Sequence, residues 1–195
     1  KMNFIAIENS TNICSVGLFV NSRLIKLLEE KTIEHSKCLP LFVDKLLKEN
    51  KMNIDYITLS IGPGSFTALK VGSSFTKGLA TALKVPIIPI DTFDGMKYNI
   101  KSSDKYYIAI YSHKNYAFSC LYDDINSKIV YRCIEIDKLS DYKIFGYGFP
   151  KDFDISYKKI RPSAKNIGLL SMEKKNSYKE NSIDNINPIY LTVEK

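Results

Sequence analysis

The chain has 195 residues, of which 45% are hydrophobic and 25% are charged, a composition typical of a soluble globular protein with one full domain or two small ones. No apolar run approaches the roughly 20 residues of a membrane helix, and four scattered cysteines without a C-x-x-C pair favour reduced thiols in a cytoplasmic protein. The net charge of +7 comes mostly from lysines spread along the chain, so charge alone is weak support for RNA binding.

The first part of the chain predicts an antiparallel meander. Apolar and β-branched runs at residues 4–7, 13–20 and 23–28 are typical of short strands. A polar turn follows the first run and an Asn-Ser pair follows the second, and connections this short join antiparallel neighbours. We therefore expect three adjacent strands.

A helix that ends near Glu49 is expected next. Its apolar residues recur at i, i+3, i+4, i+7 and i+8, which puts them on one stripe of a helix. They are Leu39, Phe42, Val43, Leu46 and Leu47. Counted from this stripe, Pro40 falls in the first helical turn.

The most informative segment joins a strand at 56–61 to a second helix through a Gly-Pro-Gly turn, which neither strand nor helix can continue across. Ser65 or Thr67 is expected to cap that helix. Small residues recur along it at steps of four and form one face, which would let another helix approach closely. They are Ala68, Gly72, Thr76 and Ala80. A strand at 85–90 follows.

A glycine turn that leads into a helix also suggests a phosphate site, because free backbone N–H groups and the helix dipole point at the turn. Gly62, Gly64 and Ser65 are the weak candidates for such a site. No lysine follows in the order of a P-loop, so a plain connection between strand and helix is the preferred interpretation.

The order of elements predicts a repeated fold. Three strands, a helix, a strand, a helix and a strand form the ribonuclease-H-like pattern, whose helical crossovers are right-handed. A second meander is expected at 106–112, 116–122 and 128–136, followed by a strand at 143–147, a helix capped by Ser163 and a strand-like tail at 189–193. The prediction is an α/β, actin-like fold with two lobes, residues 1–98 and a shortened 99–195. The short second lobe disfavours independent ATP hydrolysis.

Catalytic groups are sparse in this sequence. His35 and His113 are its two histidines, and neither stands in a metal-ligand motif. Ser65 lacks the G-x-S-x-G context of a serine nucleophile. Glu8 follows the first strand, where actin-like ATPases hold a carboxylate for the metal, but one carboxylate cannot assemble a site and we interpret it as a turn residue. No metal site is predicted.

Three segments resemble the TsaB (YeaZ) family: IAIENSTNICSVGLF, EHSKCLPLFVDKLL and, above all, SIGPGSFTALKVGSSFTKGLATALKVPIIPIDTF. The likeness is close over residues 4–95 and weak over 105–195. It implies an actin-like two-lobe protein without an active site of its own. Such a protein pairs with the catalytic paralogue TsaD and recruits the ATPase TsaE, and the complex forms N6-threonylcarbamoyladenosine next to the anticodon of tRNA.

The resemblance also implies that the helices of the first lobe meet those of the partner. The expected interface residues are His35, Leu39, Phe42, Val43, Leu46, Ala68, Lys70, Gly72, Ser73, Thr76 and Ala80. On this hypothesis Gly72→Leu would block the complex and leave the fold intact. A homodimer through the same face is expected for the isolated chain. No cofactor is expected on this chain, whereas ATP or ADP with magnesium could bind at the assembled complex.

The sequence departs from the family pattern at three places: Glu8-Asn9, Ala68-Leu69-Lys70 and Tyr111-Ser112-His113. These changes weaken any residual nucleotide site. The alternative hypothesis is a stand-alone small ATPase or kinase of the actin-like fold. A glycoprotease function is disfavoured, because the sequence has no metal-ligand motif. Direct binding of tRNA by this chain stays open.

Overall fold

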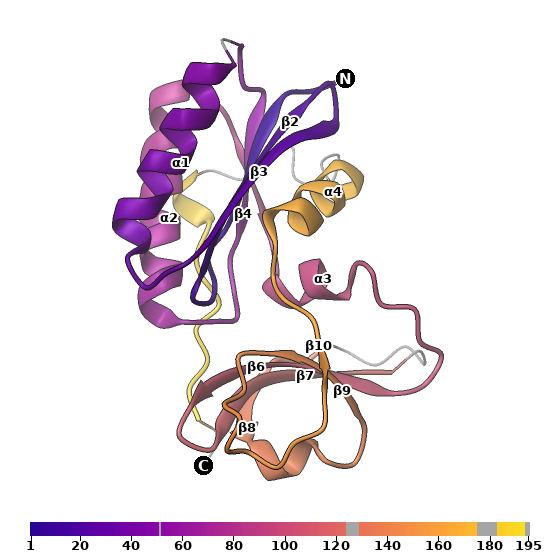
Figure 1. Ribbon diagram of the computed structural model, residues 1–195. Helices are drawn as coiled ribbons and strands as arrows, with labels where there is room; N and C mark the ends of the chain where they lie inside the picture. The colour runs from indigo at the N-terminus through magenta and orange to yellow at the C-terminus, as the bar shows by residue number, and fades with distance from the viewer. Residues whose placement is uncertain (51, 124–128, 175–182, 194–195) are drawn as a thin grey trace.

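The computed structural model describes residues 1–50, 52–123, 129–174 and 183–193. Two lobes are each built around a five-stranded sheet (Figure 1). The α/β, two-lobe fold expected from the element order is confirmed. Among the described helices, none has both the length and the apolar character needed to cross a membrane.

The first sheet has the strand order β3-β2-β1-β4-β5. Its strands are β1 (Phe4–Glu8), β2 (Ile13–Val20), β3 (Arg23–Lys31), β4 (Tyr56–Ser60) and β5 (Ile87–Ile90). The first three form the predicted antiparallel meander, while β4 and β5 add in parallel through helical crossovers. Each of the first-lobe strands therefore lies where the apolar runs predicted it.

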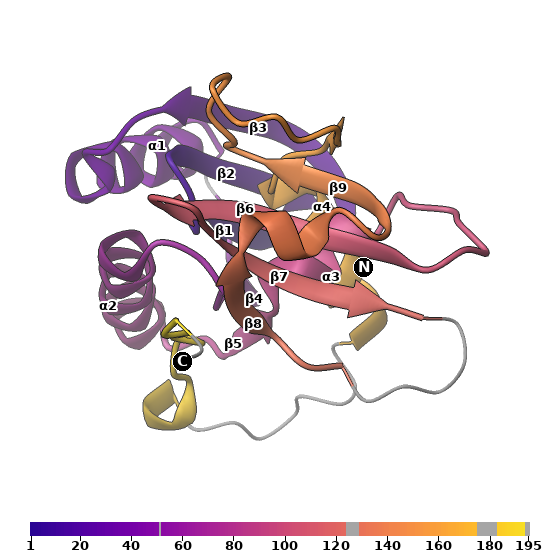
Figure 2. The same ribbon diagram turned by 90° about the horizontal axis from the view of Figure 1, so that it is seen from below.

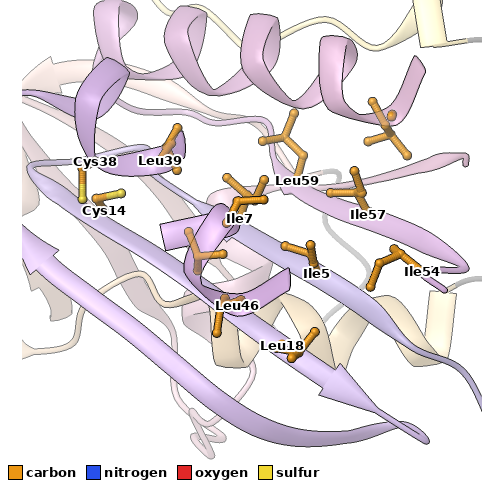
Figure 3. Close-up of a cluster of buried hydrophobic side chains, with 14 of the residues drawn as sticks. Ile5, Ile7, Cys14, Leu18, Cys38, Leu39, Leu46, Ile54, Ile57 and Leu59 are labelled. Carbon is orange, nitrogen blue, oxygen red and sulfur yellow. The ribbon is translucent and has the colours of Figure 1, made fainter. Parts of the chain in front are cut away.

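Helices α1 (His35–Glu49) and α2 (Phe66–Leu83) lie side by side on one face of this sheet (Figures 1 and 2). Their apolar stripes and the facing sheet residues form the core drawn in Figure 3, which includes Leu39, Leu46 and Ile57. Helix α1 starts earlier than expected, because the carbonyl of Glu34 already accepts the N–H of Cys38 at 3.0 Å. Pro40 therefore sits in the second turn, and its prediction for the first turn is wrong.

The second sheet repeats the first with the order β10-β9-β6-β7-β8. Its strands are β6 (Tyr106–His113), β7 (Tyr116–Tyr122), β8 (Arg132–Glu135), β9 (Lys143–Tyr147) and β10 (Lys158–Lys159). Strand β9 is parallel to β6, as β4 is to β1. The 3-10 helix η1 (Ile136–Leu139) stands where the first lobe has α1, so the repeat is shortened as predicted.

The last helix, α4 (Ala164–Lys174), packs on the first lobe, although the boundary predicted between residues 98 and 99 assigned it to the second. It covers the face of the first sheet opposite α1 and α2, next to the short helix α3 (Thr92–Lys97) (Figure 1). Its Ala164 N–H donates to Ser15 Oγ at 2.9 Å, and Gly168 lies against the ring of Phe19. A contiguous division of the chain is therefore wrong for this helix.

The small-residue face of α2 turns inward, toward its own lobe. Ala68, Gly72, Thr76 and Ala80 are all buried, and Ser73 beside them is 8% exposed. Asn9, just past β1, lies over this face and donates from Nδ2 to the carbonyl of Ala68 at 2.6 Å. The expectation that this face is offered to a partner is wrong, because small side chains admit whichever neighbour comes close, and here that neighbour belongs to the same chain.

The apolar stripe of α1 is likewise core. His35, Leu39, Val43 and Leu46 are buried against the sheet, and Phe42 is half-buried at its edge. An amphipathic stripe indicates which face of a helix is buried, but it does not indicate whether the same chain or a partner covers that face. Of the eleven predicted interface residues, Lys70 alone is exposed to solvent.

Two glycines of α2 provide a matched test of this packing. A Cβ on Gly72 would lie 2.1 Å from Asn9 Oδ1, whereas a Cβ on Gly78 would meet nothing within 4 Å. We expect Gly72→Ala to destabilise the protein by roughly 1–3 kcal/mol through overpacking. Gly78→Ala should stabilise it by about 0.5–1 kcal/mol, because alanine has the higher helix propensity. Urea unfolding followed by circular dichroism measures both.

Equal urea midpoints for the two variants would contradict this packing of α2. Gly72→Leu should disrupt the first lobe itself, so this variant cannot separate the loss of partner binding from the loss of the fold.

Candidate functional site

A cleft of about 960 Å³ lies between the lobes. The first lobe contributes the loop after β1 and the first turn of α2, and the second lobe contributes the end of β6. These wall residues are Ser10, Thr11, Asn12, Ser65, Phe66, Thr67, Ile110, Tyr111, Ser112 and His113. Residues 191–193 also line the cleft, as do Ile33, His35, Ala68, Phe118, Cys133, Tyr147 and Gly148. It is the place where an actin-like fold could hold a ligand between its lobes.

The Gly-Pro-Gly turn is explained by close packing. A Cβ on Gly64 would lie 2.3 Å from the carbonyl oxygen of Ser10, which also accepts the N–H of Ser65 at 2.8 Å. Gly62 has φ +104° and lies beneath Ile189. Both glycines are buried, so of the three weak phosphate candidates Ser65 is the exposed one, and its hydroxyl caps α2 by accepting the N–H of Ala68 at 3.5 Å. The predicted cap is confirmed, and the phosphate site stays a prediction.

Glu8 is the last residue of β1 and is 1% exposed, so its interpretation as a turn residue is wrong. Its Oε1 accepts the N–H of Ser10 at 2.7 Å. Burial raises the pKa of this carboxyl above its usual value, which disfavours the charged form that a metal would need. Nowhere in the described part of the chain do three His, Cys, Asp or Glu side chains gather closely enough to hold a metal ion.

The two histidines have different surroundings. His35 is buried at the start of α1, where its Nε2 donates to the carbonyl of Thr11 at 2.9 Å, and burial lowers its pKa. This neutral side chain anchors the helix to the loop after β1. His113 ends β6 and is exposed at the rim of the cleft, where Ser112 Oγ lies 3.0 Å from its Nδ1. This contact joins neighbouring residues at the solvent-facing end of β6, and the described hydrogen bonds add no carboxylate that would orient the ring for catalysis.

Two hydrogen bonds that the sequence did not predict join the lobes. Tyr131 donates to Asp91 at 2.5 Å, and Tyr147 donates to Asn12 at 2.9 Å. Asp91 directly precedes α3, but its side chain makes no capping bond. Burial raises the pKa of Asp91, while the bond from Tyr131 opposes this shift. Pairs this distant in sequence leave no local pattern from which they could be predicted.

A second hollow, a groove of about 390 Å³, runs between α1 and α2 on the outside of the first lobe. Its lining residues are His35, Ser36, Leu39, Pro40, Lys70, Val71, Ser74 and Phe75. Leu41, the residue after Pro40 on α1, is 61% exposed. We call this hollow the α1–α2 groove. Sequence reasoning missed Leu41, Val71 and Phe75, although apolar residues that fall off the buried stripe are the pattern that indicates them.

Glu8→Gln tests the state of the buried carboxyl. Because the folded pKa is raised, the unfolded chain loses the Glu8 proton first as pH rises above about 4.5, and stability falls until the folded pKa is passed. The amide variant lacks this loss, so its stability relative to the wild type should be greater at pH 7 than at pH 4.5. Urea unfolding at both pH values measures the difference, and an identical difference at the two would contradict a raised pKa.

Comparisons with known proteins agree with this architecture. Residues 29–139 match the family described as "TsaD: tRNA N6-adenosine threonylcarbamoyltransferase". The "tRNA threonylcarbamoyladenosine biosynthesis protein TsaB" of Buchnera aphidicola is 30% identical over 91 residues, which cover 45% of this chain and 41% of that protein. The protein of the same name from Escherichia coli is 32% identical over 94 residues, covering 47% and 41%. The chain thus spans about two fifths of the length of these curated relatives.

The solved structure of YeaZ from Pseudomonas aeruginosa superposes with a TM-score of 0.79 and 19% identity, covering 98% of this chain and all of that one, which shows a shared fold. The matched family covers more than half of the present chain, from β3 through the second meander to η1. The chain therefore belongs to the TsaD family, in which its relatives include the TsaB (YeaZ) proteins.

Proposed function

We propose that this chain is a non-catalytic subunit in the formation of tRNA N6-threonylcarbamoyladenosine. On this proposal it pairs with a TsaD protein, which performs the transfer, and helps to recruit the ATPase TsaE. The names of its relatives support the process. The observation that carries the role is the α1–α2 groove, because it is the place where apolar side chains of the first lobe stay open to solvent between two long helices.

The groove has the chemistry of a helix-docking surface. The half-buried side chains of Val71 and Phe75 line it, together with exposed Ser74 and Lys70. An apolar patch rimmed by polar residues is typical of a protein interface. Because Lys70 is exposed at the groove, an acidic residue on the partner would complement it. The proposed interface therefore uses the outer faces of α1 and α2, while their inner faces hold the lobe together.

The state of Glu8 supports a non-catalytic role. A carboxylate that binds nucleotide-associated metal must reach the cleft in its charged form. Here the side chain is fully buried, its pKa is raised, and it does not line the cleft. Chemistry supplied by a paralogous partner fits this arrangement better than chemistry in this chain.

The proposal is tested by mixing the chain with TsaD from the same organism and measuring mass in solution by light scattering. Ser74 lines the groove and is exposed, so Ser74→Asp should weaken the complex at least about tenfold, because an unpaired carboxylate would be buried at the interface. Ser103→Asp is the matched control, since Ser103 is exposed in the segment before β6, and it should bind like the wild type. Circular dichroism checks that both variants stay folded.

Two results would contradict the proposal. One is the absence of any complex with TsaD, both with and without TsaE and nucleotide. The other is unchanged affinity for Ser74→Asp, which would exclude the groove as the interface.

The second candidate, a small stand-alone ATPase or kinase, is favoured by one observation: the N-terminus of α2 borders the cleft between the lobes. Calorimetric titration of magnesium ATP into the isolated chain decides between the two. Tight binding with turnover would establish the enzyme. A tRNA mobility shift by the isolated chain that weakens with salt would instead establish direct RNA contact.

A further inference from the structure

We propose that residues 186–193 form a detachable strap that ties the two lobes together, covers the start of α2 and closes one side of the interlobe cleft. The strap would open without unfolding of either lobe. This inference concerns the chain alone and does not depend on any partner.

The strap is anchored first on the first lobe. Ile186 is 3% exposed and belongs to the core beneath α1 and α2. Further on, the N–H of Ile189 donates to the carbonyl of Ile61 at 2.7 Å, directly before the Gly-Pro-Gly turn. The carbonyl of Ile189 leaves no room for a side chain at Gly62, since a Cβ there would lie 2.9 Å from it. The chain end thus runs over the turn that leads into α2 (Figure 2).

The next residue covers the first turn of α2. The rings of Tyr190 and Phe66 lie 4.5 Å apart, and each is largely exposed, at 44% and 59%. Two exposed aromatic rings that contact one another shield apolar surface on both partners. Removal of the strap would leave Phe66, which lines the cleft, without this cover.

The strap then reaches the second lobe. Leu191 and Val193 pack against its core, and Val193 forms a parallel bridge with Cys133 on β8. Both residues also line the interlobe cleft together with Cys133. One short segment therefore contacts the turn before α2, the first turn of α2 and an edge strand of the other lobe.

The nature of these contacts makes the strap separable. From Ile189 to Val193 the chain lies outside any helix or multi-residue strand, and its side chains are half-buried or exposed. Cys133 is 2% exposed, and β8, which carries it, is held by its own pairing with β7. Segments with few buried contacts open at a lower free energy than the core to which they attach. The strap is expected to open while both sheets remain intact.

Cys133 provides a built-in reporter. Iodoacetamide is applied to the native protein, and the alkylation rate of each cysteine is followed by peptide mass spectrometry. A chain that ends at Pro188 should show Cys133 reacting at least tenfold faster than in the full-length chain. The rates at Cys120, which is buried in the same second-lobe core, and at Cys14 in the first lobe should change less than twofold. The rate of each cysteine is compared between the shortened and the full-length chain, so intrinsic differences in reactivity among the cysteines do not affect the result.

Tyr190→Ala is the milder variant, in case the shortened chain folds poorly. It removes the contact with Phe66 and keeps the rest of the strap, so the rate at Cys133 should rise severalfold while Cys120 again stays constant. An unchanged Cys133 rate in the folded, shortened chain would overturn the proposal. So would a joint rise at Cys133 and Cys120, because the segment would then be an integral part of the second lobe.

Discussion

The contact between the loop after β1 and the start of α2 fixes the geometry of the first lobe. Asn9 is fully buried, its amide donates to the carbonyl of Ala68, and its oxygen occupies the space above Gly72. Next to it, the carbonyl of Ser10 accepts from Ser65, and this approach leaves no room for a side chain at Gly64. A shift of strand against helix would break the hydrogen bond of the buried Asn9 Nδ2 group. Gly64 and Gly72 are required by this contact, because a Cβ at either position would collide with Ser10 or Asn9.

This constraint separates the surfaces of the two helices. Their inner sides are used by the core and by Asn9, and what remains for other molecules is the α1–α2 groove and the first turn of α2 at the cleft. A partner at the groove and a ligand in the cleft would approach the same helix from different directions. The first lobe therefore carries two hollows, which share His35 as a lining residue, whereas the second lobe contributes to the cleft alone.

Much of the fold could be predicted from the sequence, because local patterns determine it. Short apolar and β-branched runs identified the strands, the Gly-Pro-Gly turn identified the crossover, and the second meander indicated the repeat. The site was harder to predict. Periodicity showed that one face of α2 carries small residues. Such a face indicates close packing, but it does not identify the element that packs there. The placement of α4, the burial of Glu8 and the pair formed by Tyr131 and Asp91 depend on contacts between distant residues, which no window of sequence contains.

The position of α4 changes how the architecture is to be understood. The face of the first sheet formed by Phe4, Phe19 and Tyr56 is covered by a helix that the chain supplies only after completing the second sheet. The smaller lobe is thus an insertion nested inside the larger one, rather than a tandem copy that follows it. A fragment cut after α3 would carry a bare aromatic sheet face into water, so the first lobe should not be stable when it is expressed without the chain beyond it.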